Sequence, residues 1–212
     1  MRDVDSELGE PVLSEAKEAP LRPHVVVLTG AESTGKTTLA ARLAARFALP
    51  WGPEFVRGYA DAKGGPLDAA DVEPIARGQI ALEDDVVAAA IRVRARAVVL
   101  DTDLLSTAVY ARYYYGDRPA WIDRALLARR ADLYLLCHPD VAWVADPQRD
   151  SAEARAAIHD LFVAGLAAIA ARVVDVRGGW DERERRAVAA VDALLREESS
   201  PLRESGRPPA GL

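Results

Sequence analysis

Short apolar runs alternate with longer, partly polar stretches along residues 23–197 of the chain. Four of these runs are rich in β-branched residues or leucine and lie at Val25–Thr29, Ala97–Leu100, Leu133–Cys137 and Arg172–Val176. Runs of this length are typical of strands that are buried on both faces of a parallel sheet. A weaker strand is expected near Phe47–Trp51, which gives a sheet of about five strands.

The stretches between these runs are rich in alanine, leucine and arginine, and each is long enough to form a helix. We expect helices over residues 35–47, 68–95, 104–115, 151–171 and 181–196. Alternation of strands and helices predicts an α/β fold, a doubly wound parallel sheet with helices on both faces.

The two ends of the chain show no sustained period and are rich in charged residues, proline or glycine. We therefore expect disordered tails at residues 1–22, which are acidic, and 198–212, on either side of one domain at 23–197. About 24 residues precede the first expected strand, and we expect no further domain before it.

The composition is that of a globular protein, with 50% hydrophobic and 28% charged residues among 212. The formal net charge of −6 makes the chain a poor candidate for binding nucleic acid or anionic membranes. Its single cysteine, Cys137, excludes an internal disulfide and a cysteine metal cluster. The sequence has neither a membrane-spanning apolar run nor a signal peptide, so we expect a cytoplasmic protein.

The first apolar run leads directly into GAESTGKT at residues 30–37, which matches the phosphate-loop (Walker A) motif G-x-x-x-x-G-K-[ST]. Gly30 and Gly35 let the backbone turn its N–H groups toward an anion, and the following helix adds the partial positive charge of its N-terminus. Lys36 has the length to reach the β- and γ-phosphates, and the Thr37 hydroxyl can bind Mg²⁺. The motif between a strand and a helix predicts binding of a nucleoside triphosphate, ATP in the first instance, with Mg²⁺.

Asp101 and Asp103 follow the apolar run Ala97–Leu100. A carboxylate at the end of a buried strand beside a phosphate loop is placed to hold Mg²⁺. The two-residue spacing points both side chains in one direction if the extended conformation continues through Thr102. Asp103 has an alternative role as the cap of a helix that begins at Leu104, and the two aspartates can have different roles.

Glu54 and Arg57 follow the weak strand, at the end of the sheet where open α/β folds bind ligands. Glu54 is a candidate general base for a substrate hydroxyl, and Arg57 is a candidate for binding phosphate or orienting Glu54. The alternative is an ion pair between residues three apart on the surface of a helix.

Tyr110, Tyr113 and Tyr114 share one face of the helix expected over 104–115. They either pack on the core, which is the more common role, or form a stacking wall for a flat heterocycle, and the same choice applies to Trp121.

Two loops that follow the later strands supply further candidates. Residues 141–150 contain proline and charges and are suited to a lid, whose Arg149 is our first candidate for contacting a transferring phosphoryl group and Arg155 the second. The segment Arg177–Trp180 follows the last strand and is where we look for recognition of the nucleotide base.

Five segments together resemble the ribosylnicotinamide kinase domain of NadR-type proteins, a branch of the P-loop kinases, and the resemblance extends from about Val25 to Leu195. They are GAESTGKTTLA at 30–40, PEFVRGYAD at 53–61, IARGQIALED at 75–84, VVLDTDLLSTAVYARYYYG at 98–116 and LLCHPDVAWVADPQRDS at 135–151.

The resemblance implies transfer of the γ-phosphoryl group of ATP to the ribose 5′-hydroxyl of nicotinamide riboside, giving nicotinamide mononucleotide. It implies that the loop residues Gly30, Glu32, Ser33, Thr34, Gly35, Lys36, Thr37 and Thr38 hold the ATP phosphates. It further implies that Thr37 and Asp101 hold Mg²⁺, and that Arg149 is the lid arginine. Glu54, Arg57 and Asp103 would face the nucleoside.

One departure from the family pattern lies in the acceptor region. The best-known members have a tryptophan directly before the glutamate of the second segment, where this chain has Pro53 before Glu54. Trp51, two residues earlier, or a tyrosine such as Tyr110 is then expected to contact the nucleoside ring. The sequence leaves open two other functions, a kinase for another nucleoside or nucleotide and a regulatory ATPase switch, and it does not predict the oligomeric state.

Overall fold

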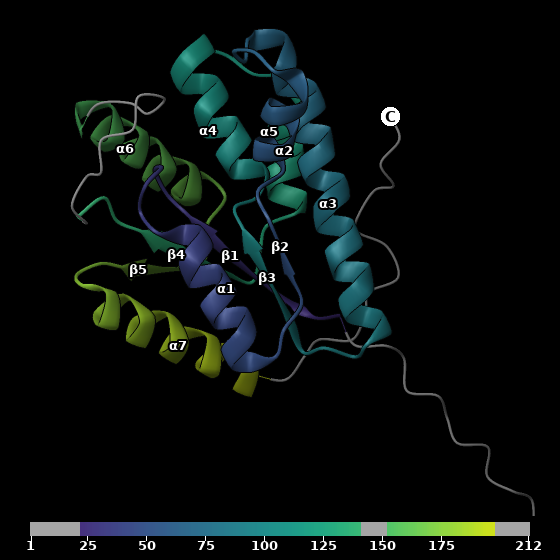
Figure 1. Cartoon of the computed structure of the whole chain (residues 1–212), viewed down its shortest axis with the longest axis vertical. Coiled ribbons are helices and arrows are strands. Elements are labelled where there is room, and N and C mark those ends of the chain that lie inside the picture. The colour runs from purple at the N-terminus through teal and green to yellow at the C-terminus, as the bar shows by residue number, and fades with distance from the viewer. Residues whose placement is uncertain (1–21, 141–151, 198–212) are drawn as a thin grey trace, which may run out of the picture.

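The computed structural model describes residues 22–140 and 152–197. The tails predicted at 1–22 and 198–212, apart from Arg22, and the segment 141–150 lie outside these ranges, so what we expect of them stays a prediction. The described residues form a sheet with helices on both of its faces (Figure 1).

The sheet has five strands in the order β2-β3-β1-β4-β5, and every neighbouring pair is parallel. The strands are β1 (His24–Thr29), β2 (Trp51–Gly52), β3 (Ala97–Asp101), β4 (Leu133–Cys137) and β5 (Val173–Val176). The α/β fold with a parallel five-stranded sheet is therefore confirmed. β5 differs from the expectation of burial on both faces, because it is an edge strand and Val173 is exposed.

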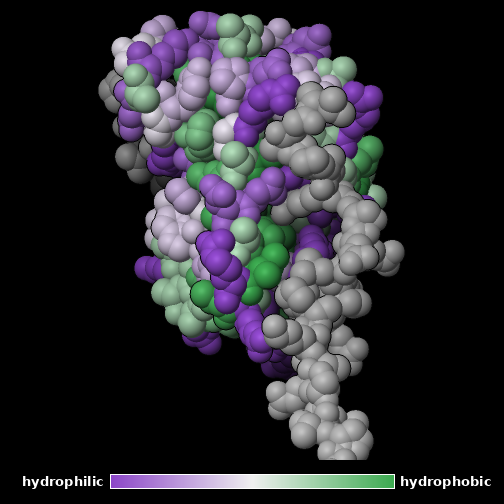
Figure 2. All heavy atoms as spheres, turned by 90° about the vertical axis from the view of Figure 1, so that its right-hand side faces the viewer, coloured by the Kyte–Doolittle hydropathy of each residue, from purple (hydrophilic) through white to green (hydrophobic). Residues whose placement is uncertain are grey.

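Seven α-helices and one 3₁₀ turn surround the sheet in the described part of the chain. They are α1 (Lys36–Phe47), α2 (Phe55–Lys63), the 3₁₀ turn η1 (Ala69–Asp71), α3 (Val72–Arg92), α4 (Leu104–Tyr115), α5 (Trp121–Ala128), α6 (Ala152–Ala168) and α7 (Trp180–Arg196). None of these helices has both the length and the hydrophobicity that crossing a membrane requires. Figure 2 shows the side of the molecule on which α3 lies, where hydrophilic and hydrophobic residues are interspersed.

The central strand β1 supplies side chains to two separate cores. Val25 and Val27 face a core built with residues of α3, α4, α5 and α6. Val26 and Leu28 face the opposite core, built with α1 and α7. This alternation follows from the two-residue period of a strand, and it explains why the first apolar run has no polar side chain until Thr29.

Two helices were not expected from the sequence. α2 is nine residues long, contains Gly58 and has no buried residue, so its amphipathic pattern is too short to stand out in the sequence. α5 is eight residues long and buries only Ile122 and Leu126, one turn apart. The helix expected over 68–95 is divided, because Asp68 caps the turn η1 before α3 begins.

Candidate active site

The phosphate loop lies between β1 and α1 and is shaped by residues with positive φ. Gly30, Ser33 and Gly35 have φ angles of 125°, 53° and 82°. A side chain is excluded at Gly30, because a Cβ there would lie 2.5 Å from the carbonyl oxygen of Cys137. A backbone turned in this way directs its N–H groups at an anion, and the positive end of α1 faces the same place.

Lys36 is a buried lysine whose ammonium group closes the loop. Its Nζ donates to the carbonyl oxygen of Ala31 at 2.8 Å, and the Thr34 hydroxyl donates to the same oxygen at 2.8 Å. Burial lowers the pKa of Lys36, and the nearby carboxylates of Glu54 and Asp101 act in the opposite direction. A phosphate beside Nζ would add a further negative charge and stabilise the charged ammonium.

Asp101, the last residue of β3, brings a buried carboxylate next to the Thr37 hydroxyl. The Thr37 side chain hydrogen-bonds to it, and Oδ1 has no hydrogen-bond partner in the described structure. Burial raises the pKa of Asp101. A hydroxyl and an unpartnered carboxylate oxygen beside a phosphate loop fit Mg²⁺, which takes few protein ligands and completes its shell with phosphate oxygens and water.

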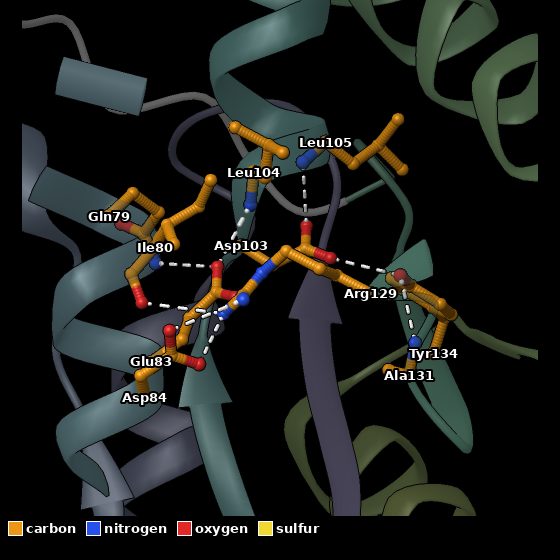
Figure 3. Close-up of polar contacts among 10 residues, drawn as sticks. All are labelled: Gln79, Ile80, Glu83, Asp84, Asp103, Leu104, Leu105, Arg129, Ala131 and Tyr134. Atoms are coloured by element: carbon orange, nitrogen blue, oxygen red, sulfur yellow. Dashed lines mark hydrogen bonds and ion pairs between the residues drawn. The ribbon is translucent and has the colours of Figure 1, made fainter. Parts of the chain in front are cut away.

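Asp103 has different surroundings from Asp101, because Thr102 has a φ of 74° and ends the extended conformation. The expectation that both carboxylates point in one direction depended on an extended Thr102 and is not met. Asp103 is the N-cap of α4: its Oδ1 accepts from the Leu105 N–H at 3.1 Å and its Oδ2 from the Tyr134 hydroxyl at 2.9 Å (Figure 3). Burial, together with the nearby carboxylate of Glu83, raises the pKa of Asp103 to about 7.

Glu54 and Arg57 form an ion pair and also contact the phosphate loop. Arg57 Nε donates to Glu54 Oε2 at 2.7 Å, and Arg57 Nη2 approaches the Thr37 hydroxyl at 3.4 Å. Glu54 precedes α2 as its N-cap, yet its side chain caps no backbone N–H. The ion pair between Glu54 and Arg57, which the sequence allowed as an alternative, therefore exists. It is not confined to the helix surface, because both residues also line the cavity.

A cavity of about 930 Å³ is lined by the phosphate loop, the Glu54–Arg57 pair and Asp103, whereas Asp101 is not among its lining residues. Its walls include every predicted phosphate-loop residue except Gly30, together with Glu54, Arg57, Thr102 and Asp103. The opposite wall is aromatic: Tyr110, Tyr114 and Tyr115 line it, and the Tyr110 and Tyr114 rings stack with centroids 6.1 Å apart at 15°. Burial, with Glu32 and Glu54 nearby, raises the pKa of Tyr110 far above its usual range.

Two tryptophans proposed as possible ring contacts lie away from this cavity. Trp51 is 40% exposed at the start of β2 and does not line the cavity. Trp121 packs against the core and lies 4.9 Å from Arg77, so core packing is its role here. The tyrosines, including Tyr110, are the aromatic wall.

Of the two arginines predicted to contact the transferring phosphoryl group, Arg155 is described by the structure and Arg149 is not. Arg149 lies outside the described residues. Arg155 lies in α6 and is 3% exposed, and its Nε and Nη2 have no hydrogen-bond partner in the described structure. It is not among the residues that line the cavity.

Trp180, in the segment expected to recognise the base, lines the nucleotide side of the cavity. Its ring packs on the phosphate loop, because a Cβ at Gly35 would lie 2.5 Å from it. Arg183, one turn further along α7, was not predicted to have a role. It is 0% exposed and donates to the carbonyl oxygens of Thr34, His138 and Gly178. Its role depends on contacts with residues far away in the sequence. Nothing in the sequence distinguishes this arginine from the other 23.

The phosphate loop after β1, the acidic end of the adjacent β3 and the strand order define a P-loop domain of the nucleoside- and nucleotide-kinase type. The chain belongs to the AAA domain family, whose sequence model matches residues 25–183. It is homologous to the trifunctional NAD biosynthesis/regulator protein NadR of Salmonella typhimurium strain LT2 and of Escherichia coli strain K12. Each is 28% identical over 186 residues, which cover 84% of this chain and 44% of the relative.

Solved structures give the same relationship. A crystal structure of NadR protein in complex with NR has a TM-score of 0.67 and 28% identity, over 85% of this chain and 54% of that one. NadR protein in complex with NAD and AMP-PNP has a TM-score of 0.65 and 27% identity, over 85% and 52% of the two chains. Thymidylate kinase from Ehrlichia chaffeensis, at 15% identity, a TM-score of 0.61 and coverage of 81% and 98%, shows the same fold. The resemblance to NadR-type proteins is thus confirmed, and the chain spans less than half the length of these curated relatives.

Proposed function

We propose that this protein is a Mg²⁺- and ATP-dependent kinase that phosphorylates nicotinamide riboside to nicotinamide mononucleotide. The observation that carries the proposal is that Lys36 and Thr37 line the same cavity as Glu54, Asp103 and the tyrosine wall. Homologous NadR proteins have been crystallised with NR and with NAD and AMP-PNP, which supports a nucleotide and a nucleoside as the two ligands.

Each of these residues has a separate role in the proposed phosphoryl transfer. The turned backbone of the phosphate loop and Lys36 hold the β- and γ-phosphates and stabilise the charge that moves to the leaving oxygen. Thr37 and Asp101 would hold Mg²⁺, which would neutralise part of the phosphate charge. Glu54 accepts the proton of the acceptor hydroxyl as its oxygen bonds to the γ-phosphorus and the bond to ADP breaks. Arg57 orients Glu54 through the 2.7 Å contact.

The acceptor side of the cavity has the chemistry for a flat, cationic ring. Tyr110 and Tyr114 supply stacked aromatic faces, and Glu32, Glu54 and Asp68 supply carboxylates around them. The nicotinamide ring of the riboside is a pyridinium cation, which aromatic faces and carboxylates both attract. Among the described residues that line the cavity, Lys36 and Arg57 are the cations. An acceptor that itself carries a phosphate, such as a nucleoside monophosphate, would therefore find no further cation there to bind that phosphate.

The proposal is tested by coupled ADP release with Mg-ATP against a panel of acceptors. The panel contains nicotinamide riboside, the common ribo- and deoxyribonucleosides, nucleoside monophosphates and no acceptor. We expect ADP only with nicotinamide riboside, with nicotinamide mononucleotide as the second product by chromatography. Phosphoryl transfer to another acceptor would mean that this acceptor, and not nicotinamide riboside, is the substrate. Equally slow ADP release with every acceptor and with none would favour a regulatory ATPase.

Replacing Trp180 with alanine should raise the KM for ATP about tenfold, because stacking of a base on an aromatic ring contributes roughly 1–3 kcal/mol. We expect the KM for the acceptor to change less than twofold, since Trp180 lies on the nucleotide side of the cavity. Steady-state kinetics with each substrate varied in turn measures both values. Trp180→Phe, which keeps an aromatic face, should recover most of the loss, and an unchanged KM for ATP in Trp180→Ala would place the base elsewhere.

A further inference from the structure

Two side chains of α3 bind the first backbone N–H of two other helices. Gln79 Oε1 accepts from the N–H of Phe55, the first residue of α2, at 3.2 Å. Glu83 Oε1 accepts from the N–H of Leu104, the first residue of α4, at 3.1 Å (Figure 3). Gln79 and Glu83 lie one helical turn apart on the same face of α3, and both are buried.

Each of these N–H groups adjoins a residue that faces the acceptor side of the cavity. Phe55 follows Glu54, and Leu104 follows Asp103. The first N–H groups of a helix have no partner within the helix, so a side chain or water must satisfy them. At α2, Gln79 satisfies the first N–H and the Glu54 carboxylate caps none, which leaves the carboxylate directed at Arg57 and the cavity.

Further contacts hold α3 in this position. The ring of Phe55 packs over Gly78, where a Cβ would lie 2.1 Å from it, so the residue beside Gln79 must be small. Glu83 Oε2 accepts from Arg129 Nη2 at 3.1 Å, and their side chains are 3% and 6% exposed. Arg129 also binds Asp84 at 2.8 Å and approaches the carbonyl oxygen of Ile80 at 3.3 Å (Figure 3). A buried ion pair of this kind fixes the direction of the Glu83 carboxylate.

We propose that Gln79 and Glu83 are positioning residues for phosphoryl transfer, which set the separation of Glu54 and Asp103 across the acceptor site. The turn of α3 from Gln79 to Glu83 keeps these two side chains about 6 Å apart along the helix axis, since four residues rise 1.5 Å each. This inference rests on the proposed function only in placing the acceptor between Glu54 and Asp103. Glu83 does not line the cavity, so it acts through Leu104 and Asp103, whereas Gln79 lines the cavity as well.

The test is steady-state kinetics of Gln79→Met, Glu83→Leu and Glu83→Gln with each substrate varied in turn. We expect Gln79→Met and Glu83→Leu to raise the acceptor KM about tenfold and to lower kcat, with the KM for Mg-ATP within twofold of wild type. Glu83→Gln keeps an oxygen acceptor for the Leu104 N–H and should recover the acceptor KM to within about threefold. Asp84→Asn is the matched control, because it alters a partner of the same Arg129 and leaves Gln79 and Glu83, which bind the two helix-start N–H groups, in place, and its acceptor KM should stay within twofold.

The outcomes separate this inference from a structural role and from the proposed function. A purely structural role would lower the active fraction, so that kcat falls with the folded fraction while both KM values stay at wild type, and this result would overturn the inference. If Glu83→Leu does not fold, Glu83→Met, which keeps the length of the side chain without a carboxylate acceptor, takes its place, because Gln79 also lines the cavity and can contact the acceptor directly. If wild type transfers to another nucleoside, the riboside assignment fails and the variants are measured with that acceptor. Absence of transfer by wild type to any acceptor would overturn both.

Discussion

Replacing Lys36 with alanine should lower kcat for phosphoryl transfer about a thousandfold. Lys36 Nζ is the buried cation of the phosphate loop, and no neighbouring cation among the described residues can take its place, since Arg57 is engaged by Glu54. Loss of one donor to the charge that develops in a transition state costs about 10²–10³ in rate, and a full positive charge lies at the upper end of that range. Initial rates at saturating Mg-ATP and acceptor measure the effect.

The fold should survive this substitution. The carbonyl oxygen of Ala31, which accepts from Lys36, also accepts from the Thr34 hydroxyl at 2.8 Å, so the loop stays closed. Alanine also favours the first turn of α1. The melting temperature should therefore stay within a few degrees of wild type, and Arg46→Ala, at an exposed position on the same helix, should keep full activity. Full activity in Lys36→Ala would remove the phosphate loop from the mechanism.

The parts of the fold and site that could be predicted from the sequence are those encoded by neighbouring residues. The phosphate loop is one continuous segment, in which glycine spacing, a strand and a helix occur in fixed order. α4 was predicted with the bounds that it has, because Asp103 caps its start and Gly116 ends it with a φ of 80°. The placing of Thr37 beside Asp101 was implied by the family resemblance, and the structure explains it by the parallel pairing of β1 with β3.

The parts that could not be predicted depend on residues far apart in the chain. Asp103 accepts a hydrogen bond from Tyr134 and lies near Glu83, which the two-residue spacing from Asp101 could not show. The positive φ of Thr102 is also a tertiary effect, since threonine rarely adopts that conformation. α2 has no buried residue, and the contact of the Phe55 ring with Gly78 attaches its start to α3. Such contacts have no periodic signature.

Arg183 is the clearest long-range case, and its replacement by methionine should destabilise the protein by about 3 kcal/mol. The guanidinium group joins three loops: it donates to the carbonyl oxygens of Thr34 at 3.2 Å, His138 at 2.8 Å and Gly178 at 2.8 Å. It also pairs with the Asp140 carboxylate. Each buried carbonyl left without a donor costs roughly 1–3 kcal/mol, and water that reaches the site offsets part of the sum.

Chemical denaturation and thermal melting measure this effect. For a chain of this size, about 3 kcal/mol corresponds to a fall in melting temperature of roughly 6–12 °C. Arg186→Met is the matched control on the same helix: Arg186 forms an exposed i, i+4 pair with Glu182, and its loss should change the free energy of unfolding by less than about 0.5 kcal/mol. Arg183→Lys should recover only about 1 kcal/mol, because one ammonium group cannot reach acceptors on three loops.

The same substitution should weaken ATP binding beyond the loss of stability. Arg183 holds Thr34 of the phosphate loop against the loop that contains Gly178, two residues before Trp180. The phosphate contacts and the face for the base are thus fixed relative to each other by one side chain, 149 residues distant in sequence from Thr34. We therefore expect the KM for ATP to rise several-fold in Arg183→Met at temperatures where the variant is folded, with the acceptor KM unchanged. Wild-type stability in Arg183→Met would mean that water replaces all three donors, and the guanidinium group would then have no structural role.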